Sequence, residues 1–561
     1  MDKRQLDTQF YVSYQITAED VASLAADGFK TIICNRPDGE AVDQPNMVEI
    51  ENASIKHGIE FHALPVQSGN ITDADSAAFT RLMKSAPAPV LAYCRSGTRC
   101  TIFWSLYQAR IGAQADAILR ATKQAGYDMS GLLSQLQARG TQTHTGANYD
   151  ILIVGAGAGG IAVASSILKR HRGAKIGIID PAQVHYYQPG WTMVGAGIFD
   201  AQSTVKTMAS LIPEGVEWIQ AAVATFEPES NQLVLENQQR IGYQRLIVTP
   251  GLKLDWHGVD GLVDTLGRNG VTSNYRFDLA PYTWKLVSEL RSGTAIFTQP
   301  PMPIKCAGAP QKALYLSADH WHRTGRLGDI AIDFCNAAGV LFGVKEYVPP
   351  LMKYIDKYRA SLSFGHNLKR IDGEAGKAWF EVEGESGEPQ LVEKRFDFIH
   401  VCPPQTAPDF ITASPLAGDA GWVDVDQNTL RHKTWDNIWS LGDVMSAPNA
   451  KTAAAARMQA PIVANNVLED MGISGGIAHY NGYGSCPLTV ERGKVLLAEF
   501  GYGGKLLPSF PSWIINGTRP SRLAWLLKEK ILPPIYWQAM LKGREWLVQP
   551  KHSPKSAGEG E

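Results

Sequence analysis

The sequence predicts an α/β protein made of two α/β regions in series. Short apolar strands alternate with helical segments over the first 110 residues, a pattern typical of a mainly parallel sheet. A second α/β region begins with YDILIVGAGAGG at 149–160, where a glycine-rich turn follows an apolar strand. A chain of 561 residues is also too long for a single hydrophobic core.

These patterns divide the chain into four parts. We expect a thiol-bearing α/β domain, a helical linker, a dinucleotide-binding domain, and C-terminal helices with a polar tail, at 1–110, 111–148, 149–505 and 506–561 respectively.

Composition narrows the class of function. The formal charge of -2 and the pI near 6.7 provide no basic field, so no nucleic-acid partner is expected. No apolar run reaches the about 18 residues of a membrane-spanning helix. The start, MDKRQLDTQF, lacks the apolar stretch of a secretory signal. Seven cysteines are too few for a disulfide scaffold, so we expect a reducing compartment and no metal site.

The glycine-rich turn predicts a dinucleotide site. Gly155, Gly157 and Gly160 stand in G-x-G-x-x-G spacing between an apolar strand and a helix. The first glycine permits the tight turn, the second lets the backbone approach a pyrophosphate, and the third lets helix and strand pack closely. The helix N-terminus attracts phosphate. Asp180 ends the next strand, where a carboxylate binds ribose hydroxyls.

Later segments favour FAD over a nicotinamide cofactor. LIVTPG (246–251) and NIWSLGDV (437–444) resemble segments with which flavoproteins of two dinucleotide-binding domains close over FAD. Asp443 would then approach the ribityl-phosphate region. The second half begins at GTAIFTQPP (293–301), and the following PPMPIKCAGAPQK has no glycine cradle for a pyridine nucleotide. The absence of a second cradle argues against an NADH-dependent reductase and favours an electron donor that attacks a cysteine.

Residues 149–545 resemble sulfide:quinone oxidoreductases, particularly the branch that includes the mitochondrial enzyme. The segments that carry the resemblance are HYYQPGWTMVGAG (185–197), PIKCAGAPQKALYLS (303–317), FGVKEY (342–347), AGWVDVD (420–426), AKTAAAA (450–456) and YNGYGSCPL (480–488). The resemblance implies that Cys306 and Cys486 are redox cysteines. It also implies that FAD is the cofactor and that Gln188, Val223 and Lys451 contact it.

The resemblance further implies the reaction. Sulfide would be oxidised to a protein-bound persulfide, with FAD as electron carrier, membrane quinone as electron acceptor, and a small thiol or sulfite as sulfur acceptor. HS⁻ can attack a Cys306–Cys486 bridge and leave one persulfide and one thiolate. Such a bridge requires Cα atoms within about 7 Å, unless a sulfur atom is inserted. Cys335 and Cys402 follow apolar runs and are expected to be buried.

A second thiol site is predicted near the N-terminus. In PVLAYCRSGTRC (89–100), Cys94 ends a strand and precedes a helix, so loop amides, the helix N-terminus and Arg99 would lower the thiol pKa. The spacing is C-x₄-R, whereas cysteine phosphatases typically use C-x₅-R. CRSGTR resembles the loop of single-domain rhodaneses. The surrounding domain, with TIICNRPD and FHALPV, resembles a phosphatase-like family fused to sulfur-metabolism proteins.

Three roles stay open for this phosphatase-like domain with a rhodanese-like loop: sulfur transfer, which we favour, phosphatase activity, and an inactive docking module. Cys100 is either a resolving thiol or a buried helix residue.

The C-terminal part predicts contact with a membrane surface. Residues 520–547 combine an apolar face with Trp, Tyr, Lys and Arg, as an interfacial helix hairpin does. In the resembled family this segment gives access to membrane quinone. We therefore expect a peripheral protein at the cytoplasmic face of the cell membrane that is not secreted. Helices that cover the flavin domain, or a homo-oligomer interface, are the alternatives.

Two other functions stay open. One is a quinone-reducing NADH dehydrogenase of related fold, which the missing second glycine motif disfavours. The other is a sulfide-sensing or scaffold flavoprotein without turnover.

Overall fold

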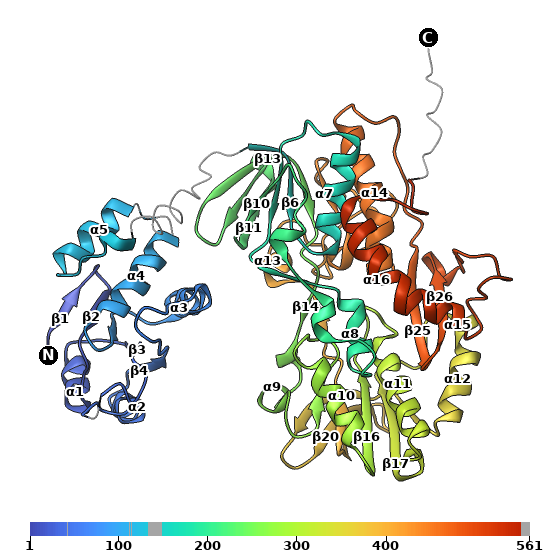
Figure 1. Ribbon diagram of the computed structural model, residues 1–561, viewed down its shortest axis with the longest axis horizontal. Coiled ribbons are helices and arrows are strands. Elements are labelled where there is room, and N and C mark those ends of the chain that lie inside the picture. The colour runs from blue at the N-terminus through green and yellow to red at the C-terminus, as the bar shows by residue number, and fades with distance from the viewer. Residues whose placement is uncertain (42, 111–112, 114, 133–147, 551–561) are drawn as a thin grey trace. The chain divides into compact units, whose positions relative to one another are not determined.

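The computed structural model describes residues 1–41, 43–110, 113, 115–132 and 148–550. The chain forms two compact units; the first consists mainly of Met1–Ala147, and the second of most of the residues from Asn148 onward (Figure 1). Each unit has its own sheets and core, and each is described by itself.

The first unit is a five-stranded sheet of order β1-β2-β5-β3-β4, in which only the β1–β2 pair is antiparallel. Along the central strand, Val90 and Ala92 pack on one face and Leu91 and Tyr93 on the other, so both faces are covered. The elements are β1 Lys3–Gln5, β2 Phe10–Ser13, α1 Ala18–Ala26, β3 Thr31–Cys34, α2 Met47–Lys56, β4 Glu60–Ala63, α3 Asp73–Ser85, β5 Val90–Tyr93, α4 Thr98–Arg110 and α5 Ala115–Gln124.

Residues 115–132 differ from the expected linker, because they belong to the core of the first unit. Ile118 of α5 is 1 % exposed, and Tyr127 and Met129 behind it are also buried against the α4 side chains Phe103 and Trp104. Burial of this apolar face holds the segment on the domain. Residues 111–112, 114 and 133–147 of the expected linker lie outside the described residues.

The second unit begins with a sheet of order β10-β7-β6-β13-β12-β11, with β24 paired to β13. Strand β6 runs parallel to β7 and β13, and helix α7 follows β6 and packs beside α14 (Figure 1). This strand–turn–helix is the dinucleotide-binding unit that the glycine spacing predicts. The elements are β6 Asn148–Val154, α7 Ala158–Arg170, β7 Ile176–Ile179, β8 Val184–Tyr186, α8 Trp191–Val194, β9 Val205–Thr207, β10 Val216–Ile219, β11 Val223–Glu227, β12 Gln232–Leu235, β13 Arg240–Val248, β24 Ile438–Ser440 and α14 Ala453–Asp470.

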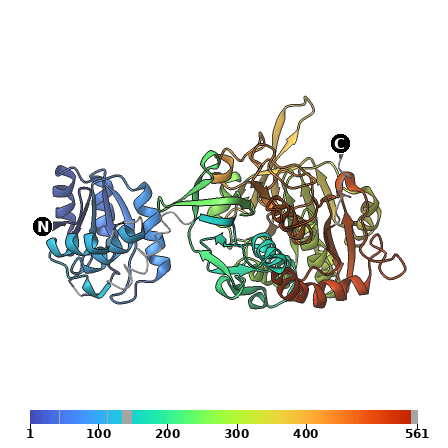
Figure 2. The ribbon, with the colours of Figure 1, turned by 90° about the horizontal axis from the view of Figure 1, so that it is seen from above.

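A second parallel sheet, of order β15-β22-β16-β17-β18, forms the other half of this unit. A three-stranded sheet β19-β20-β21 and the antiparallel ribbon β25–β26 complete it (Figure 2). The elements are β14 Lys253–Leu254, α9 Leu262–Thr265, β15 Val271–Thr272, α10 Ala280–Glu289, β16 Gly293–Gln299, α11 Ala309–Arg323, β17 Ile330–Asn336, α12 Val348–Lys357, β18 Ser361–Phe364, β19 Asn367–Asp372, β20 Lys377–Glu383, β21 Pro389–Arg395, β22 Phe398–His400, β23 Gln405–Thr406, α13 Asp409–Thr412, β25 Gly484–Glu491 and β26 Lys494–Phe500.

The C-terminal segment packs on the second unit as a chain of short helical turns. It comprises α15 Arg522–Leu526, the π-helical turn Leu527–Ile531, α16 Leu532–Pro534, a second π-helical turn Ile535–Ala539 and a 3₁₀ turn Met540–Lys542. Within the described residues, no helix combines the length and the apolar character needed to cross a bilayer.

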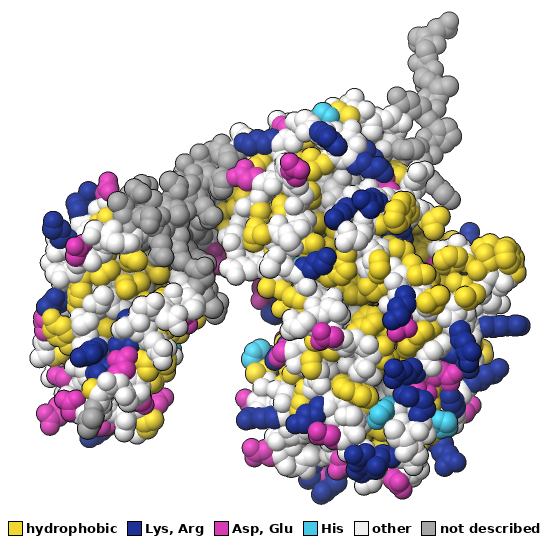
Figure 3. Space-filling model, viewed as in Figure 1, with side chains coloured by type: hydrophobic (Ala, Val, Ile, Leu, Met, Phe, Trp, Pro, Cys, Tyr) yellow, Lys and Arg dark blue, Asp and Glu magenta, His cyan; other side chains and the backbone are white. Residues whose placement is uncertain are grey.

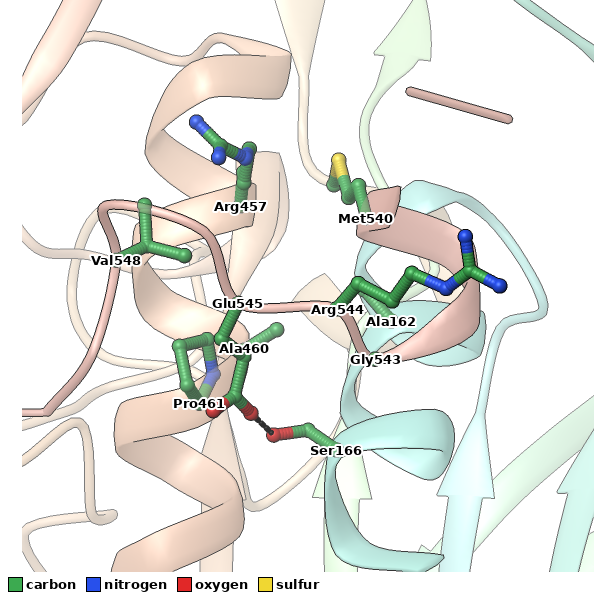
Figure 4. A pocket seen from close by; sticks show the side chains of 10 residues that line it. All are labelled: Ala162, Ser166, Arg457, Ala460, Pro461, Met540, Gly543, Arg544, Glu545 and Val548. Carbon is green, nitrogen blue, oxygen red and sulfur yellow. Dashed lines mark hydrogen bonds between the residues drawn. The ribbon is translucent and has the colours of Figure 1, made fainter. Parts of the chain in front are cut away.

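Glu545 fastens the end of this segment to α7. Its carboxylate accepts a hydrogen bond from Ser166 Oγ at 2.5 Å (Figure 4). It also accepts hydrogen bonds from Arg170 Nη1 and Nη2, at 2.5 and 2.9 Å. Ser165 Oγ donates to the carbonyl of Leu541 at 2.8 Å. The segment is therefore an integral part of the unit that carries the glycine-rich turn.

Candidate active site

The glycine-rich turn has the geometry of a dinucleotide cradle. Gly155 has a φ of +99°, and a Cβ there would lie 2.5 Å from the carbonyl oxygen of Thr249. A Cβ at Gly160 would lie 1.9 Å from the carbonyl oxygen of Gly155, so only glycine lets α7 start this close to the strand. Gly157 has open space in front of it and lines a cavity of about 580 Å³.

The other expected cofactor residues are distributed along this cavity, with one exception. Asp180, Gln188, Asp443 and Lys451 line it, whereas Val223 is buried at the start of β11 and is not part of the cavity wall. Asp180 accepts hydrogen bonds from the amides of Ala156 and Ala182, at 2.7 and 2.8 Å. Burial raises its pKa. A carboxylate beside the cradle, open amides and a long cavity fit an FAD molecule.

Lys451 lies in the cavity wall beside the cysteine loop. Its ammonium donates to the carbonyls of Asp443 and Met445, at 2.6 and 3.0 Å, and burial lowers its pKa to about 8. Its own carbonyl accepts the amide of Cys306 at 2.8 Å. Gln188 accepts a hydrogen bond from Lys305 Nζ at 2.7 Å. These contacts join the cofactor end of the cavity to the cysteine loop.

The fold brings together the two cysteines that the resemblance pairs. Cys306 lies in the loop between β16 and α11, where a second dinucleotide cradle would stand, and Cys486 lies in β25. Although 180 residues separate them, their Sγ atoms are 3.7 Å apart. A Cβ at Gly308 would lie 2.6 Å from Cys486 Sγ, so this glycine leaves the room for the sulfur. Cys306 lines the cavity, and Cys486 is buried behind it.

The thiol pair is polarised. The hydrogen bond from Cys486, followed by the charge of Lys312, holds the pKa of Cys306 well below its usual range. The same hydrogen bond and burial raise the pKa of Cys486. Lys312 Nζ lies 3.0 Å from Cys306 Sγ and 3.9 Å from Cys486 Sγ. The lowered pKa of Cys306 favours a thiolate at this sulfur, next to the Cys486 thiol and the Lys312 ammonium.

The sequence reasoning missed both lysines at this pair. Lys312 stands in the first turn of α11, six residues after Cys306 in the preceding loop, and its position within PIKCAGAPQK was a signal. Lys528 comes from the C-terminal segment and donates to the carbonyl of Pro189 at 2.9 Å. Burial and the charge of Lys312 lower the pKa of Lys528 to about 7. No local pattern placed Lys528 near a cysteine more than 200 residues earlier.

Cys335 and Cys402 are buried, as expected, and burial raises the pKa of both thiols. Cys402 is 2 % exposed, and the side-chain nitrogen of Gln405 lies 3.7 Å from Cys402 Sγ.

In the first unit, Cys94 follows β5 and the loop 95–97 wraps its sulfur. The amide of Gly97 donates to Cys94 Sγ at 3.1 Å. Hydrogen bonds from the Cys100 thiol and from the loop amides lower the pKa of Cys94 to about 5, despite burial. Cys100 is fully buried, and its pKa is raised, so it remains a thiol that donates to Cys94. Tyr127, which follows α5, donates to the carbonyl of Ser96 at 3.2 Å and holds the loop.

Arg99 is committed to contacts inside the domain. Its guanidinium binds both carboxylate oxygens of Glu40, at 2.6 and 2.8 Å, and the carbonyl of Val66 at 2.6 Å. Arg36 also pairs with Glu40, at 3.0 Å. Glu40, which the sequence reasoning missed, is therefore shared by two arginines and occupies the guanidinium of the one that flanks Cys94.

Two families match separate parts of the chain. Residues 2–111 match the family described as Beta-lactamase hydrolase-like protein, phosphatase-like domain. Residues 149–300 match Pyridine nucleotide-disulphide oxidoreductase, a match that ends just before the Cys306 loop.

Longer similarities cover most of the second unit. The mitochondrial sulfide:quinone oxidoreductase of Mus musculus is 37 % identical, with 73 % of this chain and 92 % of the relative covered. That of Dictyostelium discoideum is 40 % identical, with 70 % and 86 % covered. A solved sulfide:quinone oxidoreductase of Aquifex aeolicus has the same fold at 17 % identity, with a TM-score of 0.59 and 71 % of this chain and 92 % of that chain covered.

These comparisons also correct one expectation. Both sequence relatives are mitochondrial proteins, so the expected place at the cytoplasmic face of the cell membrane is wrong. Composition and the polar start provided no information that separates these compartments. The identities and coverage settle the family: the chain belongs to the sulfide:quinone oxidoreductase family of flavoprotein oxidoreductases and carries a phosphatase-like domain at its N-terminus.

Proposed function

We propose that the chain oxidises sulfide to a persulfide on Cys486 and passes the electrons through FAD to a quinone. The observation that carries the proposal is the 3.7 Å approach of Cys306 and Cys486 Sγ beside the Lys312 ammonium. Gly155, Gly157, Gly160 and Asp180 would hold the pyrophosphate and ribose of FAD. Gln188, Asp443 and Lys451 would lie along its remaining length, and Val223 would contribute backbone from behind the cavity wall.

The polarity of the thiol pair sets the direction of attack. In the oxidised enzyme, HS⁻ attacks the Cys486 sulfur of a Cys306–Cys486 bridge, because the thiol of lower pKa is the better leaving group. The S–S bond breaks, Cys306 leaves as a thiolate beside Lys312, and Cys486 becomes a persulfide. Two S–S bonds of about 2.05 Å each could also span the 3.7 Å between the two Sγ atoms, so a bridging sulfur fits between the cysteines.

Transfer of the outer sulfur completes the cycle. A small thiol or sulfite takes this sulfur from Cys486 and leaves a second thiolate. The bond between Cys306 and Cys486 then forms again, which releases two electrons. The chemistry that bound FAD would supply is the transfer of this electron pair to quinone. The chain itself provides the thiolate, the ammonium that stabilises it, and a cavity that reaches the cradle.

An anaerobic titration tests this function. Sulfide should bleach the FAD absorbance, a short-chain quinone should restore it, and thiosulfate should appear when sulfite is present. Bleaching by NADH but not by sulfide would favour the NADH dehydrogenase alternative. Bleaching by sulfide with no steady-state quinone reduction would favour a sensing or scaffold flavoprotein.

For the first unit, we infer sulfur transfer through Cys94. The thiolate attacks the outer sulfur of a persulfide, forms Cys94–S–SH, and releases the donor as its thiolate. The pairing of Arg99 supports this assignment over phosphate hydrolysis, because its bidentate contact with Glu40 occupies the N–H donors that a bound phosphate would need. The shorter loop also has one amide fewer for a tetrahedral oxyanion than the C-x₅-R loop.

The full-length Cys94→Ser variant separates the three roles of this domain. Flavin reduction by sulfide should be unchanged, while sulfur release to glutathione or sulfite should slow. Hydrolysis of an aryl phosphate that depends on Cys94, without sulfur transfer, would assign a phosphatase. Absence of both activities would leave a docking module.

Contact with a membrane surface is part of the proposal. Large apolar side chains are exposed along the C-terminal segment, and hydrophobic side chains gather on the face that carries α15 and α16 (Figure 3). This set, here called the apolar rim, consists of Trp513, Ile514, Leu523, Leu526, Ile531, Trp546 and Leu547. Trp546 and Leu547 also line the cavity, so the rim would bring quinone from the lipid to the site.

A further inference from the structure

The β25–β26 ribbon has two chemically different faces. Cys486 and its cross-strand partner Ala498 point into the core against α11. Because side chains alternate along a strand, the neighbouring pair Ser485 and Glu499 points the other way, into the cavity. The residue pair next to the redox cysteine is thus exposed to whatever occupies the cavity.

Glu499 is a buried carboxyl group in the cavity wall. It is 4 % exposed; Oε1 accepts the Tyr483 hydroxyl at 2.6 Å, and Oε2 accepts the Ser509 amide at 3.1 Å. Across the described chain, no lysine or arginine lies within ion-pair distance of it. An ion pair therefore does not explain its burial, and its side-chain partner is a phenol that can carry a proton.

Tyr483 connects this carboxyl group to the solvent. Its Oη lies 3.1 Å from Ser509 Oγ, and Ser509 is exposed. Burial and the nearby Glu499 raise the pKa of Tyr483, so the phenol keeps its proton at neutral pH and can act as a donor. Ser509, Tyr483 and Glu499 form a hydrogen-bonded chain from the surface to the cavity.

The cavity beside this chain suits a flat apolar ring with polar oxygens. Its wall includes Phe510, Leu527, Leu532 and Ile535, all from the segment that carries the apolar rim. Reduction of a quinone consumes two electrons and two protons, so each of its carbonyl oxygens must gain a proton. In the proposed function, bound reduced FAD would supply the electron pair together with one proton, so the wall must supply a route for the second proton.

We propose that Tyr483 donates a proton to a quinone oxygen in this cavity and that Glu499 and Ser509 replace that proton from the solvent. The inference rests on the proposed function for its electron donor. Tyr483 is the catalytic residue, because it would touch the quinone. Glu499 is a positioning residue that acts through the phenol. The proton leaves Tyr483 Oη as the quinone oxygen is reduced, and the phenol is restored through Glu499 or Ser509.

Rapid mixing of reduced enzyme with a short-chain quinone tests the inference. In Tyr483→Phe and Glu499→Gln, reoxidation of the flavin should slow by about tenfold or more, because general-acid catalysis typically contributes about 10²–10⁴-fold. Flavin reduction by sulfide and FAD content should stay at wild-type levels. Formate or acetate should restore part of the rate in Glu499→Gln, an effect that a merely structural role would not produce.

A matched control lies on the same ribbon. Glu491→Gln removes a carboxylate that pairs with Lys357 and Lys494, and it should reoxidise at the wild-type rate. Wild-type reoxidation in both Tyr483→Phe and Glu499→Gln would overturn the inference, as would a slow Glu499→Gln variant that small acids do not rescue. Enzyme that is reduced with dithionite instead of sulfide should show the same difference in flavin reoxidation between the variants and the wild type. Failure of sulfide to bleach the flavin would therefore contradict the proposed function only.

Discussion

The two reactive thiols occupy the same place in two different sheets. Cys94 follows β5, the middle strand of the first unit, and Cys306 follows β16, the middle strand of the second parallel sheet. Each precedes a helix, α4 or α11, at the carboxyl edge where parallel sheets bind ligands. Both thiols have a lowered pKa, and in each case the largest cause is a hydrogen bond from a partner thiol, Cys100 for Cys94 and Cys486 for Cys306.

The groups that cover each loop differ. Around Cys94 the partners are amides, a neutral thiol and an arginine already paired with Glu40. Around Cys306 they are a second reactive thiol and Lys312, which has no carboxylate within ion-pair distance among the described residues. In the proposed functions, the residues that cover each loop would determine whether its thiolate exchanges one sulfur atom or takes part in a two-electron couple.

The largest expected effect removes the couple itself. Cys306→Ser and Cys486→Ser should each lower sulfide-dependent quinone reduction by more than about 100-fold, because covalent catalysis requires both sulfurs. FAD content should remain, since neither thiol belongs to the glycine cradle. Cys335→Ser, at a buried cysteine elsewhere in the same sheet, is the control. Turnover like that of the control in either variant contradicts the two-thiol mechanism.

The next effect concerns the charge beside Cys306. Lys312→Met should raise the pKa of Cys306, because it removes the ammonium that stabilises the thiolate. The thiolate is the form present above the pKa, so the variant should need a higher pH for alkylation of the reduced protein by iodoacetamide. At neutral pH the rate should fall about tenfold for each pH unit by which the pKa comes to exceed the pH.

Lys345→Met, at an exposed lysine, should keep the wild-type alkylation profile. An unchanged profile in Lys312→Met would mean that Cys486 alone holds the Cys306 thiolate.

A smaller effect tests the N-terminal thiol. In a chain without Cys306 and Cys486, Cys94 should be alkylated with a midpoint near pH 5, since its pKa is lowered to about 5. Cys100→Ala removes the thiol that donates to Cys94, so the midpoint should move up by about one unit. Mass spectrometry of the labelled peptide across pH 4–8 measures it. An unmoved midpoint would show that the loop amides suffice.

Local sequence predicted the parts of the fold that local contacts determine. The spacing of Gly155 and Gly160 is a backbone requirement within one turn, and it identified the cradle. The strand and helix around Cys94 were predicted for the same reason. The pairing of Cys306 with Cys486 could not follow from spacing, because 180 residues separate them; only the family resemblance implied it.

The remaining site residues depend on contacts between segments that are far apart in the sequence, and local patterns did not predict these contacts. Lys528 and Tyr127 reach their sites from segments that were predicted as a membrane hairpin and a linker. The apolar face of α5 was a signal that this helix packs on a domain, but its partners are set by tertiary contacts. Glu40 was equally hidden, since an acid in a loop has no pattern that links it to Arg99.

The smallest expected effect concerns the apolar rim. The C-terminal segment also covers the cavity, so point substitutions test membrane contact better than truncation does. Trp513 is 84 % exposed and Leu523 is 53 % exposed, and neither lines the cavity. Trp513→Gln and Leu523→Gln should each reduce co-sedimentation with phosphatidylcholine vesicles by about threefold to tenfold, because each removes apolar area from the interface. Leu391→Gln, on β21 and 61 % exposed, is the matched control. Reduction of a long-tailed quinone in vesicles should fall with binding, while reduction of a short-chain quinone in solution should not. Equal vesicle binding by all three variants would place the membrane contact on another surface.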